Sequence, residues 1–348
     1  MGAAFSSVRE SLHGGPGYRG PSSDHFDGRR FFNPGSGAGK SWPDVLRWWG
    51  TRTRKPWPRW RDWHVEPHLP AALGPAESAI TFINHATLLI QSPQLTAITD
   101  PVFSERPSPV SFIGPRRAHA PGVPFERLPR IDLVFVSHNH YDHLDLPTLR
   151  RLALRHAPVF VTGLGNGAFL REQGIAGVVE LDWWQQTLLR GARICFTPAQ
   201  HWSDRGWHSR NRTLWGGMWL STAGCELFYS GDSGYSPLFA RMRAQLGAPD
   251  VALLPIGCYE PRWFMCEQHM NPEEAVRAHL DLEAGMSIGC HYGCFRLTDE
   301  GIDDPLIDLA AARRKLAVPT EAFHAPRPGE TRCVHARTYS SAAGESLR

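Results

Sequence analysis

The residues with the clearest chemical potential lie close together: His138, His140, Asp142 and His143 fall within six positions. An apolar, β-branched run at 131–136 precedes them and predicts a strand. Alternate residues of a strand point to the same side, so we expect His138 and His140 to point together at its end. Imidazole and carboxylate suit zinc or a similar divalent ion, and four such ligands are enough to begin two adjacent sites.

Two simpler interpretations compete with a metal centre. A lone His-x-His pair usually lies on the surface or is satisfied by hydrogen bonds, and a His-rich run can bind metal adventitiously. The complete His-x-His-x-Asp-His pattern is much rarer than His-x-His, and here it stands at the end of a predicted strand. We therefore favour a metal centre.

The complete pattern resembles the metallo-β-lactamase superfamily of metallohydrolases. That superfamily completes its site with a later His, a later Asp and a last His, each at a strand end or in a loop. His201, Asp232 and His291 match this order, and each follows a short apolar run. The resemblance implies an α/β fold, the αββα sandwich of two mixed sheets flanked by helices.

Further motifs resemble the branch of N-acyl-phosphatidylethanolamine-hydrolysing phospholipases D. They are found at 99–104, 114–117, 259–265, 268–269 and 272–275, and the run at 259–265 is specific to the branch. The similarity extends over residues 79–300. Phe82, Asn84, Ser233 and Tyr292 depart from the branch pattern, but none of these departures removes a ligand.

By resemblance, one metal is held by His138, His140 and His201, a second by Asp142, His143 and His291, and Asp232 bridges them. The predicted cofactors are two Zn²⁺ ions, with iron or manganese as alternatives. Three neutral imidazoles leave an open position for water on the first ion. Two ions about 3.5–4 Å apart can share a hydroxide and clamp the attacking and leaving oxygens.

Substrate-side groups are expected from loops near the ligands. Asp142 and His269 are the predicted catalytic residues, and Gln268, His269, Tyr235 and Arg262 are the predicted substrate-binding residues. His269 could donate to the charge that develops on a diester. Arg262 has the alternative of a structural ion pair with Glu260, Tyr235 the alternative of covering the pocket, and the apolar run 263–265 is either an acyl-chain wall or ordinary core. His85 is expected to support the ligands rather than to be one.

Composition bounds the remaining function classes. The chain has 348 residues, 42% of them hydrophobic, which suffices for one large domain. A net charge of +3 and the lack of a long basic block argue against nucleic acid as a partner. Seven Cys without a Cys-x-x-Cys pair make a disulfide framework improbable. No apolar stretch of transmembrane length and no clear signal peptide occur, so we expect a cytoplasmic protein, with peripheral membrane contact and a homodimer left open.

Three regions are expected along the chain. Residues 1–63 form an arm: a Gly-, Ser- and Pro-rich flexible leader, then a Trp- and Arg-rich segment at 40–63. That segment either anchors the protein at a membrane interface or packs its Trp side chains on the main domain, the interpretation we favour. Residues 64–326 form the catalytic domain and 327–348 a loose tail. Strands are predicted at 79–91, 95–99, 131–137, 158–162, 177–182, 192–197, 214–221, 225–230, 251–255 and 286–290. Helices are predicted at 145–156, 166–173, 236–246, 272–283 and 303–316.

Three functions compete. The first is a dinuclear-metal phosphodiesterase that cleaves N-acyl-phosphatidylethanolamine into N-acylethanolamine and phosphatidate by attack of metal-activated hydroxide on phosphorus. The second keeps the site but acts on a small cyclic phosphodiester, lactone or other ester, because one fold supports many chemistries. The third is a non-catalytic metal-binding protein. An apolar groove reaching the metals would favour the first, and a closed polar cup the second.

Overall fold

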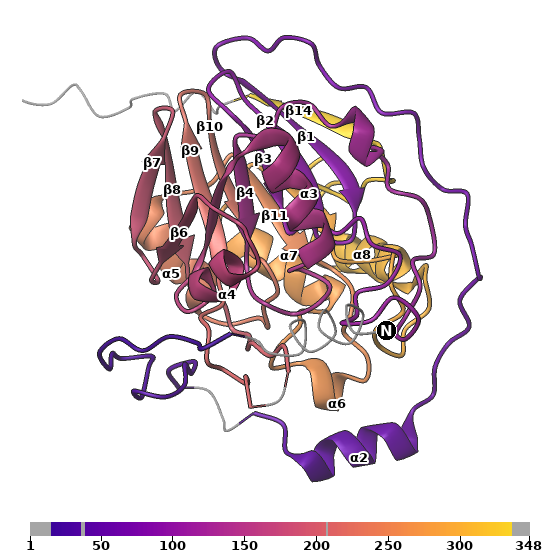
Figure 1. Ribbon diagram of the computed structural model, residues 1–348. Coiled ribbons are helices and arrows are strands. Elements are labelled where there is room, and N and C mark those ends of the chain that lie inside the picture. Colours follow the sequence, from indigo (N-terminus) through magenta and orange to yellow (C-terminus); the bar gives the residue numbers. More distant parts are fainter. Residues whose placement is uncertain (1–14, 36–38, 207, 336–348) are drawn as a thin grey trace, which may run out of the picture.

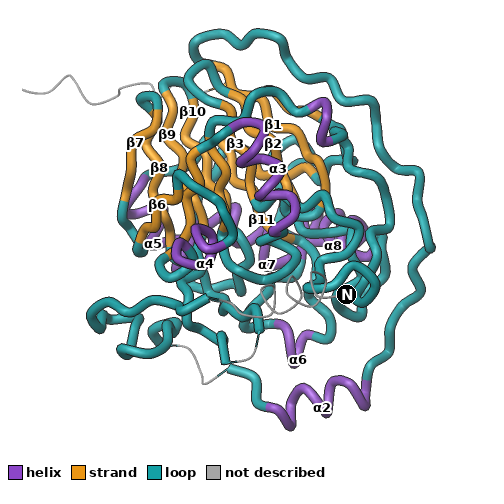
Figure 2. Tube along the Cα trace, viewed as in Figure 1, coloured by secondary structure: helices purple, strands orange, loops and turns teal. Residues whose placement is uncertain are grey.

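The computed structural model describes residues 15–35, 39–206 and 208–335. Two seven-stranded sheets pack face to face, and helices cover their outer faces (Figure 1, Figure 2). Both sheets mix parallel and antiparallel pairs. The α/β sandwich implied by the resemblance is therefore confirmed.

The first sheet has the order β14-β1-β2-β3-β4-β5-β6. Its strands are β1 (Glu77–Asn84), β2 (Thr87–Gln91), β3 (Thr96–Thr99), β4 (Leu133–Val136), β5 (Val159–Gly163), β6 (Val178–Leu181) and β14 (Thr331–His335). The helices α3 (Leu146–His156) and α4 (Gly167–Glu172) connect parallel strands and cover its outer face. Leu149 of α3 and Phe169 of α4 are buried there in one hydrophobic cluster with Val134.

The second sheet has the order β13-β12-β11-β10-β9-β8-β7. Its strands are β7 (Gln186–Leu189), β8 (Ala192–Thr197), β9 (Gly217–Thr222), β10 (Cys225–Tyr229), β11 (Val251–Pro255), β12 (Met286–Cys290) and β13 (Phe323–His324). The helices α5 (Leu238–Leu246), α7 (Pro272–Asp281) and α8 (Asp304–Lys315) cover its outer face. The predicted start of α7 is confirmed, because the Asn271 side chain accepts a hydrogen bond from the Glu274 N–H, and Glu274 accepts one in return.

Several elements differ from the sequence prediction. The predicted strand 79–91 is a hairpin of β1 and β2, and its turn includes His85 with a positive φ of 44°. The short elements α6 (Arg262–Met265), β7 and β13 were not predicted. Residues 331–335 were expected in a loose tail, but β14 pairs antiparallel with β1. That expectation is wrong for these residues, because edge pairing with β1 orders them.

The N-terminal segment 15–35 packs on the domain instead of forming a flexible leader. Phe26 and Phe31 are each 1% exposed and belong to the main hydrophobic core. Asn33 Nδ2 donates to the carbonyl of His201 at 2.7 Å, so the segment reaches the predicted site. The expectation of a flexible leader is therefore wrong for 15–35. Residues 1–14 and 36–38 lie outside the described part of the chain.

The Trp- and Arg-rich segment packs on the domain only in part. It contains a helix, α2 (Trp42–Thr51). The Trp48 ring stacks on Phe264 with 4.7 Å between centroids, and Trp63 is buried. Trp42 and Trp49, in contrast, are 80% and 69% exposed. Packing on the domain thus explains only part of the segment. No helix among the described residues is both long and apolar enough to cross a bilayer.

Candidate metal centre

The predicted ligands lie in loops at the ends of strands. The segment 138–143 follows β4, His201 follows β8, Asp232 follows β10 and His291 follows β12. Because β4 belongs to one sheet and the other three strands to the second, the site forms where the two sheets meet. The structure brings all seven predicted ligands together in groups of side chains that could hold a metal ion.

Three imidazoles converge first. His138 Nε2 lies 2.8 Å from His140 Nδ1, and His201 Nε2 lies 3.4 Å from the same atom. Ligand nitrogens about 2.0–2.1 Å from a tetrahedral ion stand roughly 3.3 Å apart, so this triad fits a Zn²⁺-sized ion. Burial lowers the pKa of His140 to about 3 and that of His201 to about 4. Both rings are therefore neutral, as a metal ligand must be.

A second group contains Asp142, His143 and His291. His143 Nε2 lies 3.1 Å from His291 Nε2, and Asp142 Oδ2 lies 3.5 Å from each of them. Asp232 connects the two groups. Its Oδ2 lies 3.1 Å from His143 Nε2 and 3.8 Å from His201 Nε2, and its Oδ1 lies 3.2 Å from His291 Nε2. This position suits a carboxylate that bridges two ions.

The charge balance of the second group also favours cations. Burial alone would raise the pKa of Asp232, but His143 and His291 outweigh it and hold that pKa well below its usual range. Burial alone would lower the pKa of His143, and Asp232, Asp142 and Asp100 instead raise it well above its ordinary value. Two buried carboxylates thus demand positive charge, which protons on the imidazoles or divalent ions can supply. The donor set fits a pair of divalent ions.

Hydrogen bonds orient the ligand rings. His201 Nδ1 donates to the Gln268 carbonyl at 3.0 Å, and His143 Nδ1 donates to Asp100 Oδ2 at 2.7 Å. In each case the other ring nitrogen, Nε2, is directed to the cluster. Such partners of ligand imidazoles fix the tautomer and raise the basicity of the ligand.

Asp100 is a functional residue whose role the sequence did not reveal. It is fully buried at the end of β3 and accepts four hydrogen bonds: from the Ser137 N–H and Oγ–H, from His143 Nδ1 and from the Tyr229 hydroxyl. Asp100 therefore joins the start of the ligand loop to a ligand. The available signal was an acidic residue directly after a predicted strand, inside the motif 99–104.

The backbone around the site adopts unusual conformations. His85, Asp100 and His291 have φ values of 44°, 34° and 60°, a region that residues other than glycine rarely occupy. Gly231 has φ 61°, and a Cβ there would lie 2.8 Å from the Gly216 carbonyl oxygen. Only glycine therefore lets the loop before Asp232 approach so closely. His85 itself contacts Asp142 Oδ2 through Nε2 at 3.1 Å, which agrees with a supporting role.

His269 belongs to a further group of possible ligands with His201 and Asp232, whereas two other predicted substrate contacts lie away from the groups. His269 is 8% exposed, and its Nδ1 lies 3.8 Å from Asp232 Oδ2 without a hydrogen-bond partner among the described residues. Burial lowers the pKa of His269 well below its ordinary value, so the ring is neutral and carries one N–H. Gln268 lies next to it and contributes its carbonyl to His201.

Arg262 and Tyr235 are directed elsewhere. Arg262 pairs with Glu274 at 2.7 Å and donates to the His269 carbonyl at 2.9 Å, so its guanidinium supports the loop that carries His269. The expected partner, Glu260, accepts only from the Arg262 backbone N–H. The Tyr235 hydroxyl donates to Asp281 of α7 at 2.7 Å. We correct both assignments, because these groups already have partners away from the metal ligands.

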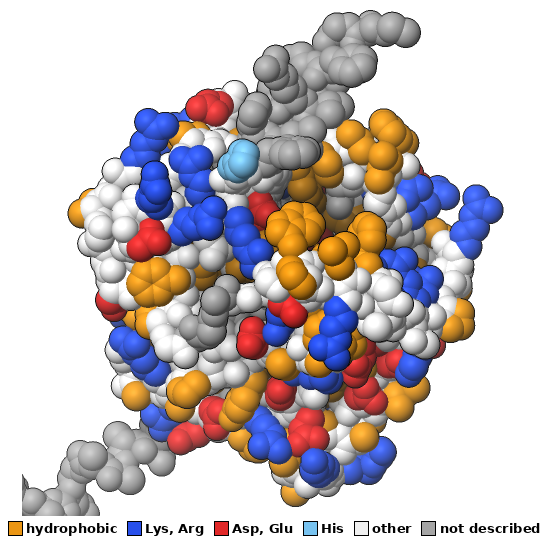
Figure 3. All heavy atoms as spheres, turned by 90° about the horizontal axis from the view of Figure 1, so that it is seen from below, with side chains coloured by type: hydrophobic (Ala, Val, Ile, Leu, Met, Phe, Trp, Pro, Cys, Tyr) orange, Lys and Arg blue, Asp and Glu red, His pale blue; other side chains and the backbone are white. Residues whose placement is uncertain are grey.

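An open groove leads from the surface to the ligands. It has a volume of about 850 Å³, and its walls are mainly apolar. Its lining includes the apolar or aromatic residues Trp42, Pro107, Pro109, Tyr141 and Trp202, the charged or polar residues Asp204, Arg205, His208 and Arg210, and the predicted ligands His140 and Asp142. Figure 3 shows hydrophobic side chains around a hollow on the face that carries α2 and α6. The groove thus gives a mainly apolar approach to one residue of each predicted metal group.

Comparisons with known proteins agree with the fold. The family model described as "Beta-lactamase superfamily domain" matches residues 96–292. An uncharacterized Mycobacterium tuberculosis protein, Rv0906, is 40% identical over 239 residues, which cover 67% of this chain and 63% of that protein. N-acyl-phosphatidylethanolamine-hydrolyzing phospholipase D 1 of Caenorhabditis elegans is 36% identical over 251 residues, 68% of this chain and 70% of that protein. The chain thus spans less than two thirds of the mycobacterial relative and slightly more of the nematode enzyme.

Solved structures share the fold at low sequence identity. Igni18, a metallo hydrolase from the archaeon Ignicoccus hospitalis, has a TM-score of 0.56 at 20% identity, and the match covers 75% of this chain and all of that one. CmlA, a diiron β-hydroxylase from Streptomyces venezuelae, has a TM-score of 0.56 at 19% identity over 75% of this chain and 55% of that one. Together with the family match and the relatives, they show that the chain belongs to the metallo-β-lactamase superfamily, in the branch of the N-acyl-phosphatidylethanolamine-hydrolysing phospholipases D.

Proposed function

We propose that the protein is a dinuclear-metal phosphodiesterase that hydrolyses N-acyl-phosphatidylethanolamine-type phospholipids to N-acylethanolamine and phosphatidate. The observation that carries this proposal is the mainly apolar groove whose lining includes His140 and Asp142. A phospholipid needs apolar walls for its acyl chains and a charged end for its phosphodiester, and the groove offers both. The relative from C. elegans carries a name with this activity, which supports the choice of substrate.

The residues divide the chemistry among them. Bound metal ions would supply a water acidic enough to serve as the nucleophile at neutral pH. His138, His140 and His201 hold one ion through neutral nitrogens, and Asp232 faces both groups. We propose zinc for both positions. The donor set also accommodates iron, the metal of the structural neighbour CmlA.

Asp142 and His269 have the proposed catalytic roles. Among the carboxylates of the predicted ligands, Asp142 is the one that lines the groove. We therefore propose that Asp142 accepts the proton of the attacking water. Its Oδ2 accepts from His85, which keeps the carboxylate oriented. His269 is assigned the opposite role, donating its N–H to the phosphoryl oxygen as negative charge develops there.

A second candidate function rests on another cavity. A mainly polar cavity of about 500 Å³ lies beside His201 and is lined by Asn33, Gln200 and Gln268, among others. Such a cup suits a small cyclic phosphodiester or a lactone. We rank it second because its lining contains one metal ligand, whereas the apolar groove reaches a ligand of each predicted ion.

Product analysis in ¹⁸O-water tests the proposal. Metal-loaded protein is incubated with N-acylated phosphatidylethanolamine, and the products are analysed by mass spectrometry, with metal-stripped protein as the control. We expect N-acylethanolamine without label and phosphatidate with one labelled oxygen, because the water oxygen bonds to phosphorus. Label in the N-acylethanolamine would mean cleavage of the carbon–oxygen bond and would contradict the mechanism. Turnover of a small diester or lactone with none of any N-acylated lipid would establish the second candidate instead.

A further inference from the structure

Helix α2 presents an apolar face to solvent. Trp42, Leu46 and Trp49 are 80%, 65% and 69% exposed. Their spacing of four and three residues places them on one side of the helix. None of the residues of α2 is buried. Several large apolar side chains that gather in solvent usually mark an interaction surface.

The opposite side of α2 is fixed to the domain. The Trp48 indole N–H donates to Asp299 Oδ2 at 2.9 Å, and its ring stacks on Phe264. Arg52, one turn later, donates to Asp299 Oδ1 at 2.9 Å and lies over the Trp48 ring at 4.1 Å. These contacts hold the helix in one rotation about its axis. The exposed face is therefore a stable feature of the surface.

A second apolar element flanks the same opening. Phe112 and Ile113, in the loop between β3 and β4, are 74% and 61% exposed. Pro107 and Pro109 of this loop line the groove together with Trp42 of α2. Helix α2 and the loop that carries Phe112 and Ile113 thus both contribute residues to the lining of the groove. We refer to Trp42, Leu46, Trp49, Phe112 and Ile113 as the apolar rim.

The surroundings of the apolar rim are basic. Residues 40–61 contain seven Lys and Arg and one acidic residue, Asp44. Acidic groups of the domain pair with Lys40, Arg52, Arg54, Lys55 and Arg61, whereas Arg47 and Arg59 have no ion-pair partner among the described residues. Asp44 caps α2 by accepting hydrogen bonds from Ser41. Arg47, Arg54 and Arg59 are exposed. Trp beside Arg and Lys is the composition found at the headgroup level of a bilayer, and each basic group near an anionic membrane surface strengthens binding about fivefold.

We propose that the apolar rim inserts into the headgroup region of a bilayer that contains anionic phospholipids, and that the mouth of the groove then opens toward the lipid. This inference rests on the proposed function, since it explains how a lipid substrate enters the groove. A lipid can move from the bilayer along Trp42 toward His140 and Asp142 without its acyl chains crossing water.

A bilayer fits this face better than a second copy of the chain does. In a two-fold symmetric dimer the same patch meets itself, so Arg47, Arg54 and Arg59 of two copies would come together. Such like charges repel, whereas an anionic membrane attracts all of them. Charge complementarity therefore selects the membrane as the occupant.

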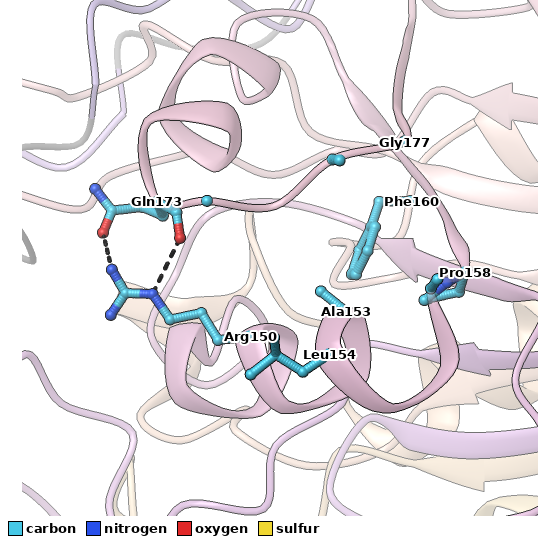
Figure 4. A pocket seen from close by; sticks show the side chains of 10 residues that line it. Arg150, Ala153, Leu154, Pro158, Phe160, Gln173 and Gly177 are labelled. Carbon is cyan, nitrogen blue, oxygen red and sulfur yellow. Dashed lines mark hydrogen bonds between the residues drawn. The ribbon is translucent and has the colours of Figure 1, made fainter.

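A matched control surface exists on another side of the molecule. Leu154 of α3 is 89% exposed and borders a cavity of about 390 Å³ (Figure 4). That cavity is lined by Arg150, Phe160 and Gln173, among others, and by none of the metal ligands. Leu154→Glu replaces an exposed leucine with a charge, as Leu46→Glu does, but leaves the apolar rim unchanged.

The test compares three variants of the full chain: Leu46→Glu with Trp49→Glu, Phe112→Glu with Ile113→Glu, and Leu154→Glu. Each is incubated with sedimenting vesicles of phosphatidylcholine, with or without phosphatidylserine. We expect the wild type and Leu154→Glu to bind the anionic vesicles equally. Both rim variants should bind at least about 100-fold more weakly, because apolar insertion is lost and negative charge is added. All five positions are exposed, and thermal unfolding of each variant checks that its fold is intact.

Separate readouts distinguish this inference from the proposed function. Hydrolysis of a short-chain, water-soluble substrate should be unchanged in the rim variants, while hydrolysis of the same headgroup in vesicles should fall with binding. Equal vesicle binding by the wild type and both rim variants would overturn the inference, whatever the protein hydrolyses. A wild-type dimer that becomes a monomer in the rim variants, without vesicle binding by either, would assign the face to a second copy. Normal rim-dependent binding without lipid hydrolysis would support the inference and contradict the proposed function.

Discussion

The role proposed for His269 leads to a quantitative prediction for His269→Ala. The ring is buried and neutral, and its Nδ1 lies 3.8 Å from Asp232 Oδ2. The three imidazoles of the first group already converge, since His138 Nε2 and His201 Nε2 lie 2.8 and 3.4 Å from His140 Nδ1, and three neutral imidazoles leave the fourth position of an ion to water. Those three can complete a site without His269. We therefore expect His269→Ala to keep both metal ions.

The size of the effect follows from the loss of one preorganised donor. Removing one such donor in a water-poor site lowers kcat by about 10²–10³, or about 2.7–4 kcal/mol of transition-state stabilisation. KM should change little, because the hydrogen bond strengthens only as charge develops on the phosphoryl oxygen. The effect therefore appears in kcat and equally in kcat/KM.

The assay combines steady-state kinetics on a soluble phosphodiester with metal analysis of the same preparation. His64→Ala is a suitable control, since His64 is exposed and its only ion-pair partner among the described residues is the exposed Asp62. Loss of one metal equivalent in His269→Ala would make His269 a ligand, and the site would have to be redrawn. A kcat within about threefold of the wild type, with both metals bound, would refute the donor role.

Three further predictions concern the metal groups and the N-terminal segment. Asp232→Asn should abolish turnover and weaken the binding of both ions together, whereas His201→Ala should release mainly the first ion. Metal analysis after dialysis tests this. Near-normal activity of Asp232→Asn with both ions bound would contradict the bridging role. Asp100→Asn should weaken the second ion by about 10–100-fold, because the ring of His143 loses its orienting carboxylate, and a chelator titration measures this. Burial lowers the pKa of His25, but hydrogen bonds with two carboxylates outweigh the effect of burial and raise this pKa above 6.5. The stabilisation from the charged His25 ring is therefore complete below pH 6.5 and lost as the pH rises through the raised pKa. His25→Gln should lower the free energy of unfolding in urea by on the order of 1.5 kcal/mol at low pH and by less at high pH. A loss of stability that does not vary with pH would contradict this.

The residues that converge in the candidate metal centre could be predicted from the sequence, because each gives a short-range signal. An apolar run followed by His or Asp predicts a strand whose end carries a polar side chain, and the order of these signals matches one superfamily. Strands and the longer helices follow from the same local patterns. Helix α2 was not predicted, because its exposed apolar residues face solvent instead of the core.

Other features depend on contacts between distant parts of the chain. Arg262 and Tyr235 look like substrate contacts in sequence, yet Glu274 and Asp281 bind them from α7. β14 is ordered only because β1 offers it an edge. Phe26 and Phe31 stand in a Gly-rich stretch whose local pattern predicts disorder, and only the assembled domain buries them.

The sequence by itself therefore determined the residue types of the candidate metal centre and the class of fold, because local spacing and strand ends encode both. Only the tertiary structure decided that Asp100 orients His143, that the groove opens beside α2, and which Trp side chains remain exposed. These features rest on hydrogen bonds and burial between segments far apart in the chain, and no local pattern records which partner a side chain will find.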